Sequence, residues 1–205
     1  MAVITISREM ATGGRKLGRL LAKRLAYQYV DKSLFQKIAE DLNVSERTLE
    51  SFEKSREYQI SNIFAKAFST SYIERIVGYD KSVVEEEKYQ KSLGNLILET
   101  AREDNVVIIG RAAYFFLKDM KNCYHIRLVA STDWKEKYAL ENYKISPDRV
   151  HGFIEKRDKN LRWFLRSICG AGFDDSLWFH LTLNMSRTPV EKAVELIMSV
   201  ANLSG

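Results

Sequence analysis

Residues 3–25 read VITISREMATGGRKLGRLLAKRL, and this stretch decides the fold class. It opens with VITI, a β-branched run of strand length. The leucines that follow recur at helical spacing: Leu17, Leu20, Leu21 and Leu25. Because the pair Gly13–Gly14 lies between these two patterns, the stretch predicts a strand, a glycine-containing loop and a helix.

The rest of the sequence continues this alternation. Short apolar runs predict further strands over residues 27–30, 105–109, 124–130 and 178–183. The run that stops at Gly110 is typical of a parallel strand buried on both faces. We therefore expect an α/β fold with a mostly parallel five-stranded sheet between helices, a kind of sheet that binds ligands at the carboxyl ends of its strands.

Helices are expected between these strands. One fits residues 33–42, and another carries its apolar residues on one face: Leu93, Leu96, Ile97 and Ala101. The last helix is expected to begin with Thr188 as its cap, Pro189 in the first helical position and Glu191 closing a capping box.

Residues 44–104 contain no proline, two glycines and no strand signal, so we interpret them as a helical insertion in a single domain. An apolar stripe runs through the insertion: Ile60, Ile63, Phe64, Ala67, Phe68, Tyr72, Ile73 and Ile76. Such a stripe either packs on the main body or forms a subunit interface, and the second alternative makes the chain a homo-oligomer.

Composition narrows the class of protein. The 205 residues are 45% hydrophobic and 29% charged, which favours one globular domain and excludes a disordered chain. Cys123 and Cys169 lack the spacing of a disulfide framework, a zinc site or a redox motif. No apolar stretch has the length of a signal peptide or a membrane span, so we expect a cytoplasmic protein without a membrane partner.

The net charge of +5 is concentrated in two segments, residues 8–24 and 149–166, each with six basic residues. The first segment contains one acidic residue, Glu9, and the second contains Glu155 and Asp158. This distribution fits a protein that binds a small polyanion such as a nucleotide, and it also fits a nucleic-acid binder.

The loop over residues 7–18 lies where a phosphate cradle belongs, between a strand and the N-terminus of a helix. The strict pattern G-x-x-x-x-G-K-[ST] is absent, because Arg15 and Lys16 follow Gly14. On these residues alone, a phosphate-binding loop and a tight turn with basic surface residues are both open.

Six segments follow one another in a recognisable order: ITISREMATGGRKLGRLLAKRL, YQYVDKSLFQKIA, VVIIGRAAYFFLKD, CYHIRLVAS, EKRDKNLR and DSLWFHLTLNMSRTPVEKAVELI. In this order the chain resembles the cytidylate kinase-like family, a branch of the P-loop nucleoside monophosphate kinases. The resemblance spans nearly the whole chain and is weakest across the insertion. It implies a three-layer P-loop NTPase-type fold, with the insertion on the acceptor side and a lid over residues 146–172. It also implies the use of ATP with Mg²⁺.

The resemblance also implies roles for single residues. The nucleotide phosphates would contact Arg8, Ala11, Thr12, Gly13, Gly14, Arg15 and Lys16. The acceptor would contact Arg111 and Asp158, and the catalytic groups would be Asp31, Arg157 and Arg162. No residue is assigned as a metal ligand.

The chain departs from the cytidylate kinase pattern at four positions. Gly14 stands at the place of the P-loop lysine, and Lys16 at the place of the hydroxyl that binds magnesium. Ala11 replaces a glycine, and Ala112 follows Arg111 where those kinases have an aspartate. Since a guanidinium makes bidentate contacts with phosphate, we expect Arg15 and the lid arginines to replace the missing lysine.

In the lid segment, Arg157 and Arg162 are five residues apart, so they lie about 140° apart around a regular helix and cannot both point the same way. Asp158 is expected to pair with Arg162, its i+4 neighbour. The alternative for this segment is a solvated amphipathic helix without a catalytic role.

Three functions fit these observations. The first is ATP-dependent phosphoryl transfer to a nucleoside monophosphate, cytidylate-like, or to another small phosphate acceptor. The second is a catalytically inactive nucleotide-binding protein that acts as a sensor or docks a partner. The third, binding of nucleic acid through the two basic segments, is the least favoured.

Overall fold

The computed structural model describes residues 2–31 and 81–203. The expected helix over 33–42, the apolar stripe and most of the insertion lie outside the described residues. The described elements, in chain order, are β1 Val3–Arg8, α1 Gly14–Leu25, β2 Gln28–Val30, α6 Lys81–Arg102, β3 Val106–Ile109, α7 Ala113–Phe116, β4 Cys123–Val129, α8 Thr132–Asn142, α9 Pro147–Cys169, the 3₁₀ helix η1 Ser176–Trp178, β5 Leu181–Asn184 and α10 Val190–Val200.

The five strands form one parallel sheet in the order β2-β3-β1-β4-β5. Strand β1 lies at its centre, with Ile4 opposite Val107 of β3 and Tyr124 of β4. Strand β1 is therefore buried on both faces, as its β-branched sequence predicts. The carboxyl ends of β1, β2 and β3 meet at one edge of the sheet.

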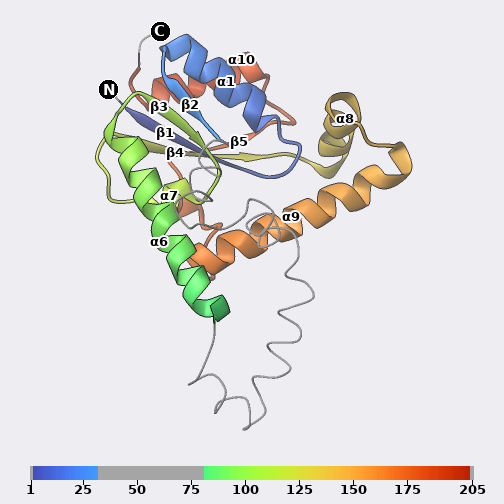
Figure 1. Cartoon of the computed structure of the whole chain (residues 1–205). Helices are drawn as coiled ribbons and strands as arrows, with labels where there is room; N and C mark the ends of the chain where they lie inside the picture. Colours follow the sequence, from blue (N-terminus) through green and yellow to red (C-terminus); the bar gives the residue numbers. More distant parts are fainter. Residues whose placement is uncertain (1, 32–80, 204–205) are drawn as a thin grey trace, which may run out of the picture.

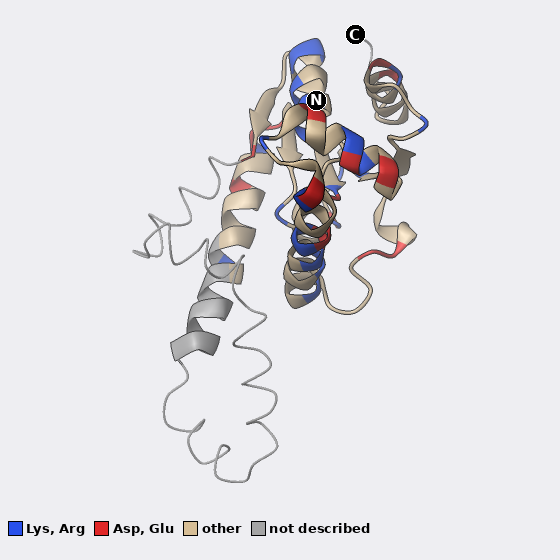
Figure 2. Ribbon diagram, turned by 90° about the vertical axis from the view of Figure 1, so that its right-hand side faces the viewer, with Lys and Arg blue, Asp and Glu red and all other residues tan. Residues whose placement is uncertain are grey.

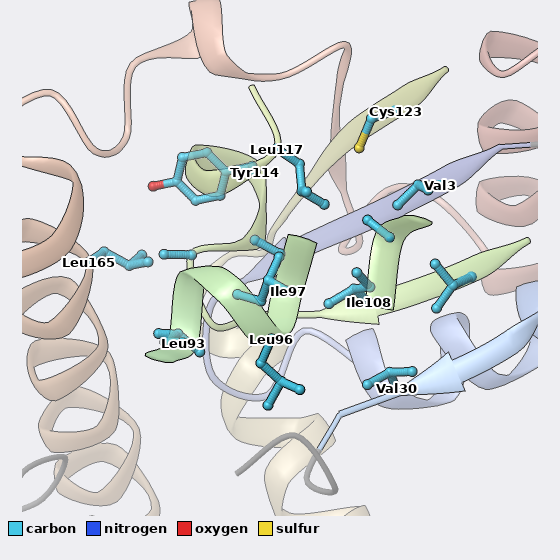
Figure 3. Packing of buried hydrophobic residues seen from close by; sticks show 14 of the residues in the cluster. Val3, Val30, Leu93, Leu96, Ile97, Ile108, Tyr114, Leu117, Cys123 and Leu165 are labelled. Atoms are coloured by element: carbon cyan, nitrogen blue, oxygen red, sulfur yellow. The ribbon is translucent and has the colours of Figure 1, made fainter. Parts of the chain in front are cut away.

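Helices cover both faces of the sheet (Figure 1). Helices α1 and α10 pack on the face of Ile4, Ile6 and Val107. Helices α6 and α7 and the C-terminal half of α9 pack on the other face, where Leu165 of α9 and Ile97 of α6 belong to the same cluster (Figure 3). The predicted three-layer α/β fold is confirmed.

A third apolar cluster lies at the edge of the sheet. Ala11 of the β1–α1 loop packs there with Ala139 of α8 and with Val150 and Ile154 of α9. Helix α9 thus contacts the body of the protein at both of its ends, through this cluster and through Leu165.

Two local predictions were wrong. The fifth strand begins at Leu181, and Trp178 lies in a 3₁₀ turn because the Asp175 side chain accepts the backbone N–H of Leu177 and the Trp178 indole donates to the Gly172 carbonyl. The last helix begins at Val190, without a capping box. Its N-cap is Pro189, which has an extended ψ of 148°, so Thr188 lies one residue too early to cap it.

Candidate functional site

The loop between β1 and α1 forms the first part of the site. Ala11 and Gly13 both take left-handed conformations, with φ of +59° and +74°. Thr12 between them is buried, and its hydroxyl donates to the Glu9 carbonyl at 2.9 Å. Gly13 is the N-cap of α1, and among the described residues no side chain caps this helix. The first-turn N–H groups of α1 are therefore suited to an anionic ligand.

Ala11 keeps the backbone conformation that a glycine would favour. A non-glycine residue in this conformation costs about 1–2 kcal/mol. The loop retains this shape although the glycine itself is absent, and the strain is of the kind found at binding sites.

Arg8 lies against the start of α1. A Cβ atom added at Gly14 would lie 2.4 Å from Arg8 Cδ, so only a glycine allows the arginine this close. Burial, followed by repulsion from Arg15, lowers the pKa of Arg8 below its ordinary value. A guanidinium keeps its proton in proteins, so Arg8 brings positive charge to the loop.

Arg111 adds a third guanidinium at this edge of the sheet. Burial and then repulsion from Arg8 lower the pKa of Arg111 to about 10, with a smaller effect of Arg15 in the same direction. Arg8 and Arg111 thus each experience the charge of the other and of Arg15. A cluster of cations that repel one another is stabilised by an anion.

Asp31, after β2, contributes the negative charge of this cluster and raises the pKa of both Arg8 and Arg111. The Tyr29 hydroxyl donates to Asp31 Oδ2 at 2.9 Å, and Arg15 Nε lies 4.0 Å from the same oxygen. Burial and this hydrogen bond raise the pKa of Tyr29 to about 12. The structure thus brings Asp31 into the neighbourhood of the arginines.

The turn that carries Arg111 is strained. Gly110, Arg111 and Ala112 have consecutive positive φ angles of +74°, +58° and +55°. The Gly110 N–H donates to the Ile6 carbonyl at 2.9 Å, which fixes the turn to the end of β1. Arg111 and Ala112 are consecutive non-glycine residues in this conformation. Backbone strain of this kind is concentrated at functional sites, where it holds a side chain in a fixed position.

A buried lysine joins the loop to α8 and α9. Lys135 Nζ lies 2.6 Å from Asp158 Oδ2 and 3.1 Å from Glu9 Oε2, and the Lys135 and Asp158 side chains are 10% and 6% exposed. The other Asp158 oxygen, Oδ1, accepts the Met10 N–H at 2.6 Å. Burial alone would lower the pKa of Lys135, but the hydrogen bonds with Asp158 and Glu9 raise it overall.

The expected partner of Asp158 was wrong. In the structure the carboxylate contacts Lys135 and the Met10 N–H rather than Arg162. The i+4 rule describes exposed helix faces, whereas Asp158 lies on the buried face of α9 and takes partners from other elements.

Helix α9 presents its two predicted arginines differently. Both are exposed. The Arg157 guanidinium lies over the Phe153 ring, 5.3 Å from its centre, whereas Arg162 lines a cavity. This division agrees with the angle of about 140° between the two positions on the helix.

The cavity lies between β1, β4, α9 and the segment that precedes β5. It is lined by Ser7, Arg8, Glu9, Arg127, Leu128, Asp158, Leu161, Arg162, Leu165, Phe173, Asp174 and Phe179. Basic and acidic residues therefore lie close together around it. Seen from the side that carries α8 and α9, the ribbon bears residues of both kinds (Figure 2). Arg8 belongs both to this cavity and to the arginine cluster at the loop.

The described residues fit a phosphate chain better than a metal ion. The loop and its arginines supply N–H donors and positive charge. In the described part of the chain, no group of three or more His, Cys, Asp or Glu residues is placed to hold a metal. Glu9 and Asp158 contact Lys135, which leaves Asp31 as the carboxylate beside the loop.

Lys135 and Arg127 are two charged residues at this site that the sequence did not single out. Lys135 is one of two lysines in a helix without an apolar stripe, TDWKEKYALEN, and it carried no signal by itself. Arg127 is a single arginine in a strand. A basic residue inside the predicted strand 124–130 was a clue to it, because strand residues that are buried rarely carry an unpaired charge.

Known proteins of similar structure share the fold. An uncharacterised protein from Eubacterium ventriosum ATCC 27560 has a TM-score of 0.70 at 19% identity, covering 98% of each chain. A shikimate kinase from Bacteroides thetaiotaomicron has a TM-score of 0.53 at 16% identity, covering 98% of this chain and 99% of its own. A gluconokinase from Sinorhizobium meliloti 1021 has a TM-score of 0.51 at 8% identity, covering 98% and 91%. Among curated proteins none matches the sequence.

No helix in the described part of the chain is both long and apolar enough to cross a membrane. The sequence profile of the cytidylate kinase-like family matches residues 3–187, which include every described element of the site. The chain therefore belongs to the cytidylate kinase-like family.

Proposed function

We propose that this protein catalyses ATP-dependent transfer of a phosphoryl group to a nucleoside monophosphate or to another small phosphate acceptor. The observation that carries the proposal is the convergence of Arg8, Arg15 and Arg111 at an uncapped helix N-terminus. Phosphoryl transfer asks a protein mainly for positioning and for positive charge around the phosphate oxygens. The family and the fold support a phosphotransferase.

The donor phosphates would lie in the loop from Ala11 to Lys16. Backbone N–H groups of the loop and the positive end of the α1 dipole would contact them. Gly14 stands where cytidylate kinases carry the P-loop lysine. Arg8 lies beside Gly14 and so would supply the charge that this lysine gives. Mg²⁺, entering as the ATP complex, supplies further neutralisation of phosphate charge when bound.

The acceptor would lie across the sheet edge from the donor. Arg111 would hold the acceptor phosphate, because its strained turn fixes the guanidinium beside Arg8. Asp31, held by the Tyr29 hydroxyl, would orient the attacking oxygen. Arg157 and Arg162 of the lid segment would add charge at the transferring group.

The second candidate is an inactive nucleotide-binding protein. It is favoured by one observation: Gly14 and Lys16 stand where the P-loop lysine and the magnesium-binding hydroxyl are expected. Binding of ATP would then survive, because the loop N–H groups and the arginines do not depend on those side chains.

Turnover separates the two candidates. The full chain is incubated with ATP, Mg²⁺ and a panel of monophosphates, and formation of ADP is followed with calorimetric titration of ATP in parallel. ADP formed in step with a phosphorylated acceptor supports the kinase. Saturable ATP binding without ADP supports the inactive protein, and absence of ATP binding contradicts both.

Two glycine variants test the loop itself. Gly14→Ala places a Cβ against Arg8 and should weaken ATP binding about tenfold or more, since Arg8 must move. Gly152→Ala is the matched control, because a Cβ there meets open space in exposed α9. If Gly14→Ala binds ATP as well as Gly152→Ala does, the donor site lies elsewhere.

A further inference from the structure

We propose that the cavity between β4 and α9 binds a second anionic group of the acceptor, besides the phosphate that Arg111 would hold, with Arg127 as a binding residue of that site. The ligand class is a small molecule in which a compact anion, phosphate or carboxylate, is attached to a ring or another apolar body. This proposal rests on the proposed function, and it adds a residue and an acceptor chemistry to it.

The position of Arg127 follows from the sheet. Arg127 of β4 lies opposite Ser7 of β1 in the parallel register. Both side chains line the cavity, on the sheet face covered by α9, and Arg162 lines it from α9 itself. Two guanidiniums from different elements, β4 and α9, therefore line one cavity together with Ser7 of β1.

Arg127 is held in place by two contacts. Its guanidinium donates to the Asp174 carbonyl and lies over the Phe179 ring, 5.6 Å from the ring centre. A guanidinium has five N–H donors, so a hydrogen bond to one carbonyl leaves other N–H groups that can bind a carboxylate or phosphate. Because the side chain is fixed before a ligand arrives, little conformational entropy is lost on binding.

Two of the three carboxylates at the cavity are engaged by other groups. Asp158 contacts Lys135 and the Met10 N–H, and Glu9 contacts Lys135. They therefore do not neutralise the cavity arginines by ion pairing. Asp174 meets Arg127 through its backbone carbonyl, which brings no charge.

The remaining walls are apolar and set the rest of the ligand class. Leu161 and Leu165 of α9 line the cavity together with Phe173 and Phe179. An apolar or ring-shaped body would bury surface there while its anion meets the arginines. Arg8 lines this cavity and also lies against the loop, so it would stand between the acceptor anion and the donor phosphates.

The test uses three small probes with one ring: phenyl phosphate, benzoate and benzyl alcohol. Each is titrated by calorimetry into the full chain and into Arg127→Met, Arg127→Lys and Arg162→Met, with Arg166→Met as control. Arg166 is exposed on α9 and is not among the residues that line the cavity. Affinity for ATP and the melting temperature are measured for every variant.

We expect at least one anionic probe to bind and benzyl alcohol not to. Arg127→Met should lower the affinity for the bound probe at least about tenfold, and the affinity of Arg127→Lys should lie between those of Arg127→Met and the wild type. The affinity for ATP should be unchanged. Binding of phenyl phosphate alone identifies a phosphate-bearing acceptor, and binding of benzoate alone identifies a carboxylic acid. Arg162 is exposed, so Arg162→Met should leave the fold intact and still lower the affinity for the probe by a similar factor. This variant keeps the test valid if Arg127→Met lowers the melting temperature.

The proposal is overturned if neither anion binds the wild-type chain, or if Arg127→Met and Arg162→Met bind the probe as tightly as Arg166→Met does. In that case Arg127 serves only to hold the segment before β5. Failure of the proposed function has a different signature, namely no ATP binding and no turnover while the anionic probe still binds in an Arg127-dependent way.

Discussion

Asp158 of α9 accepts the backbone N–H of Met10 at 2.6 Å, across 148 residues of sequence. Its other carboxylate oxygen contacts Lys135 at 2.6 Å, so both oxygens are used. A displacement of α9 would break a contact with the backbone of the β1–α1 loop. The buried carboxylate therefore ties the position of α9 to the conformation of this loop.

The first prediction concerns the cation of this cluster. Lys135→Met should lower the free energy of unfolding by about 3–5 kcal/mol, because it leaves the buried Asp158 carboxylate without its cation. Urea denaturation followed by circular dichroism measures this loss. Lys192→Met removes an exposed lysine paired with Glu195 and should change stability by less than about 1 kcal/mol. A loss below about 1 kcal/mol in Lys135→Met would show that the carboxylate has other partners.

The second prediction separates stability from activity at Arg111. Arg111→Gly relieves the backbone strain of a residue with a φ of +58°, so the melting temperature should stay equal or rise. Turnover should fall about a hundredfold or more, because the guanidinium is gone. Asn122→Gly is the control, since Asn122 has a φ of +59° and is exposed away from the site. It should gain similar stability and keep full turnover. A stable Arg111→Gly variant with normal kinetics would remove Arg111 from the acceptor site.

Sequence patterns predicted the features that depend on short stretches of chain. The strand at residues 3–6, the glycine loop and the following helix come from local periodicity, and the structure has them as β1 and α1. The placement of Asp31 and Arg111 at one sheet edge followed from a general property of parallel strands. Ala11 takes the left-handed conformation at a position where the resemblance implies a glycine.

The contacts of Lys135 could not be predicted in this way. Its partners Glu9 and Asp158 lie 126 and 23 residues away, and only the folded chain brings them together. The start of β5 was missed for a different reason. Asp175 and Trp178 form side-chain hydrogen bonds with nearby backbone, which stabilise a turn where the apolar pattern favours a strand.

The third prediction is a loss of stability in acid that depends on His125. Burial lowers the pKa of His125 from 6.5 to about 4, with His180 adding to the effect. The Thr5 hydroxyl lies 2.8 Å from the ring Nδ1, which suits a neutral imidazole. Since the unfolded chain binds this proton more readily, the stabilisation is complete above pH 6.5 and is lost as the pH falls towards 4. The loss is on the order of 3 kcal/mol.

Unfolding in urea at a series of pH values measures this loss against His125→Gln, which does not titrate. The free energy of unfolding of the variant should depend less steeply on pH between 6.5 and 4. The difference in slope should correspond to about one proton taken up on unfolding. Parallel pH profiles for the two proteins would mean that the wild-type slope comes from other groups.

The fourth prediction ranks the two arginines of the lid segment. Arg162 lines the cavity that also contains Arg8, whereas Arg157 lies over the Phe153 ring. Arg162→Ala should therefore lower turnover about a hundredfold at saturating ATP with little change in ATP affinity, because it acts on charge at the acceptor and the transferring group. Arg157→Ala should lose less than about tenfold in turnover, the scale of an exposed cation–π contact.

Initial rates and calorimetric titration of ATP on both variants give the comparison. A larger loss for Arg157→Ala would mean that α9 turns during the reaction, and near-wild-type turnover in both would leave α9 a solvated helix, with the catalytic charge coming from Arg8 and Arg15.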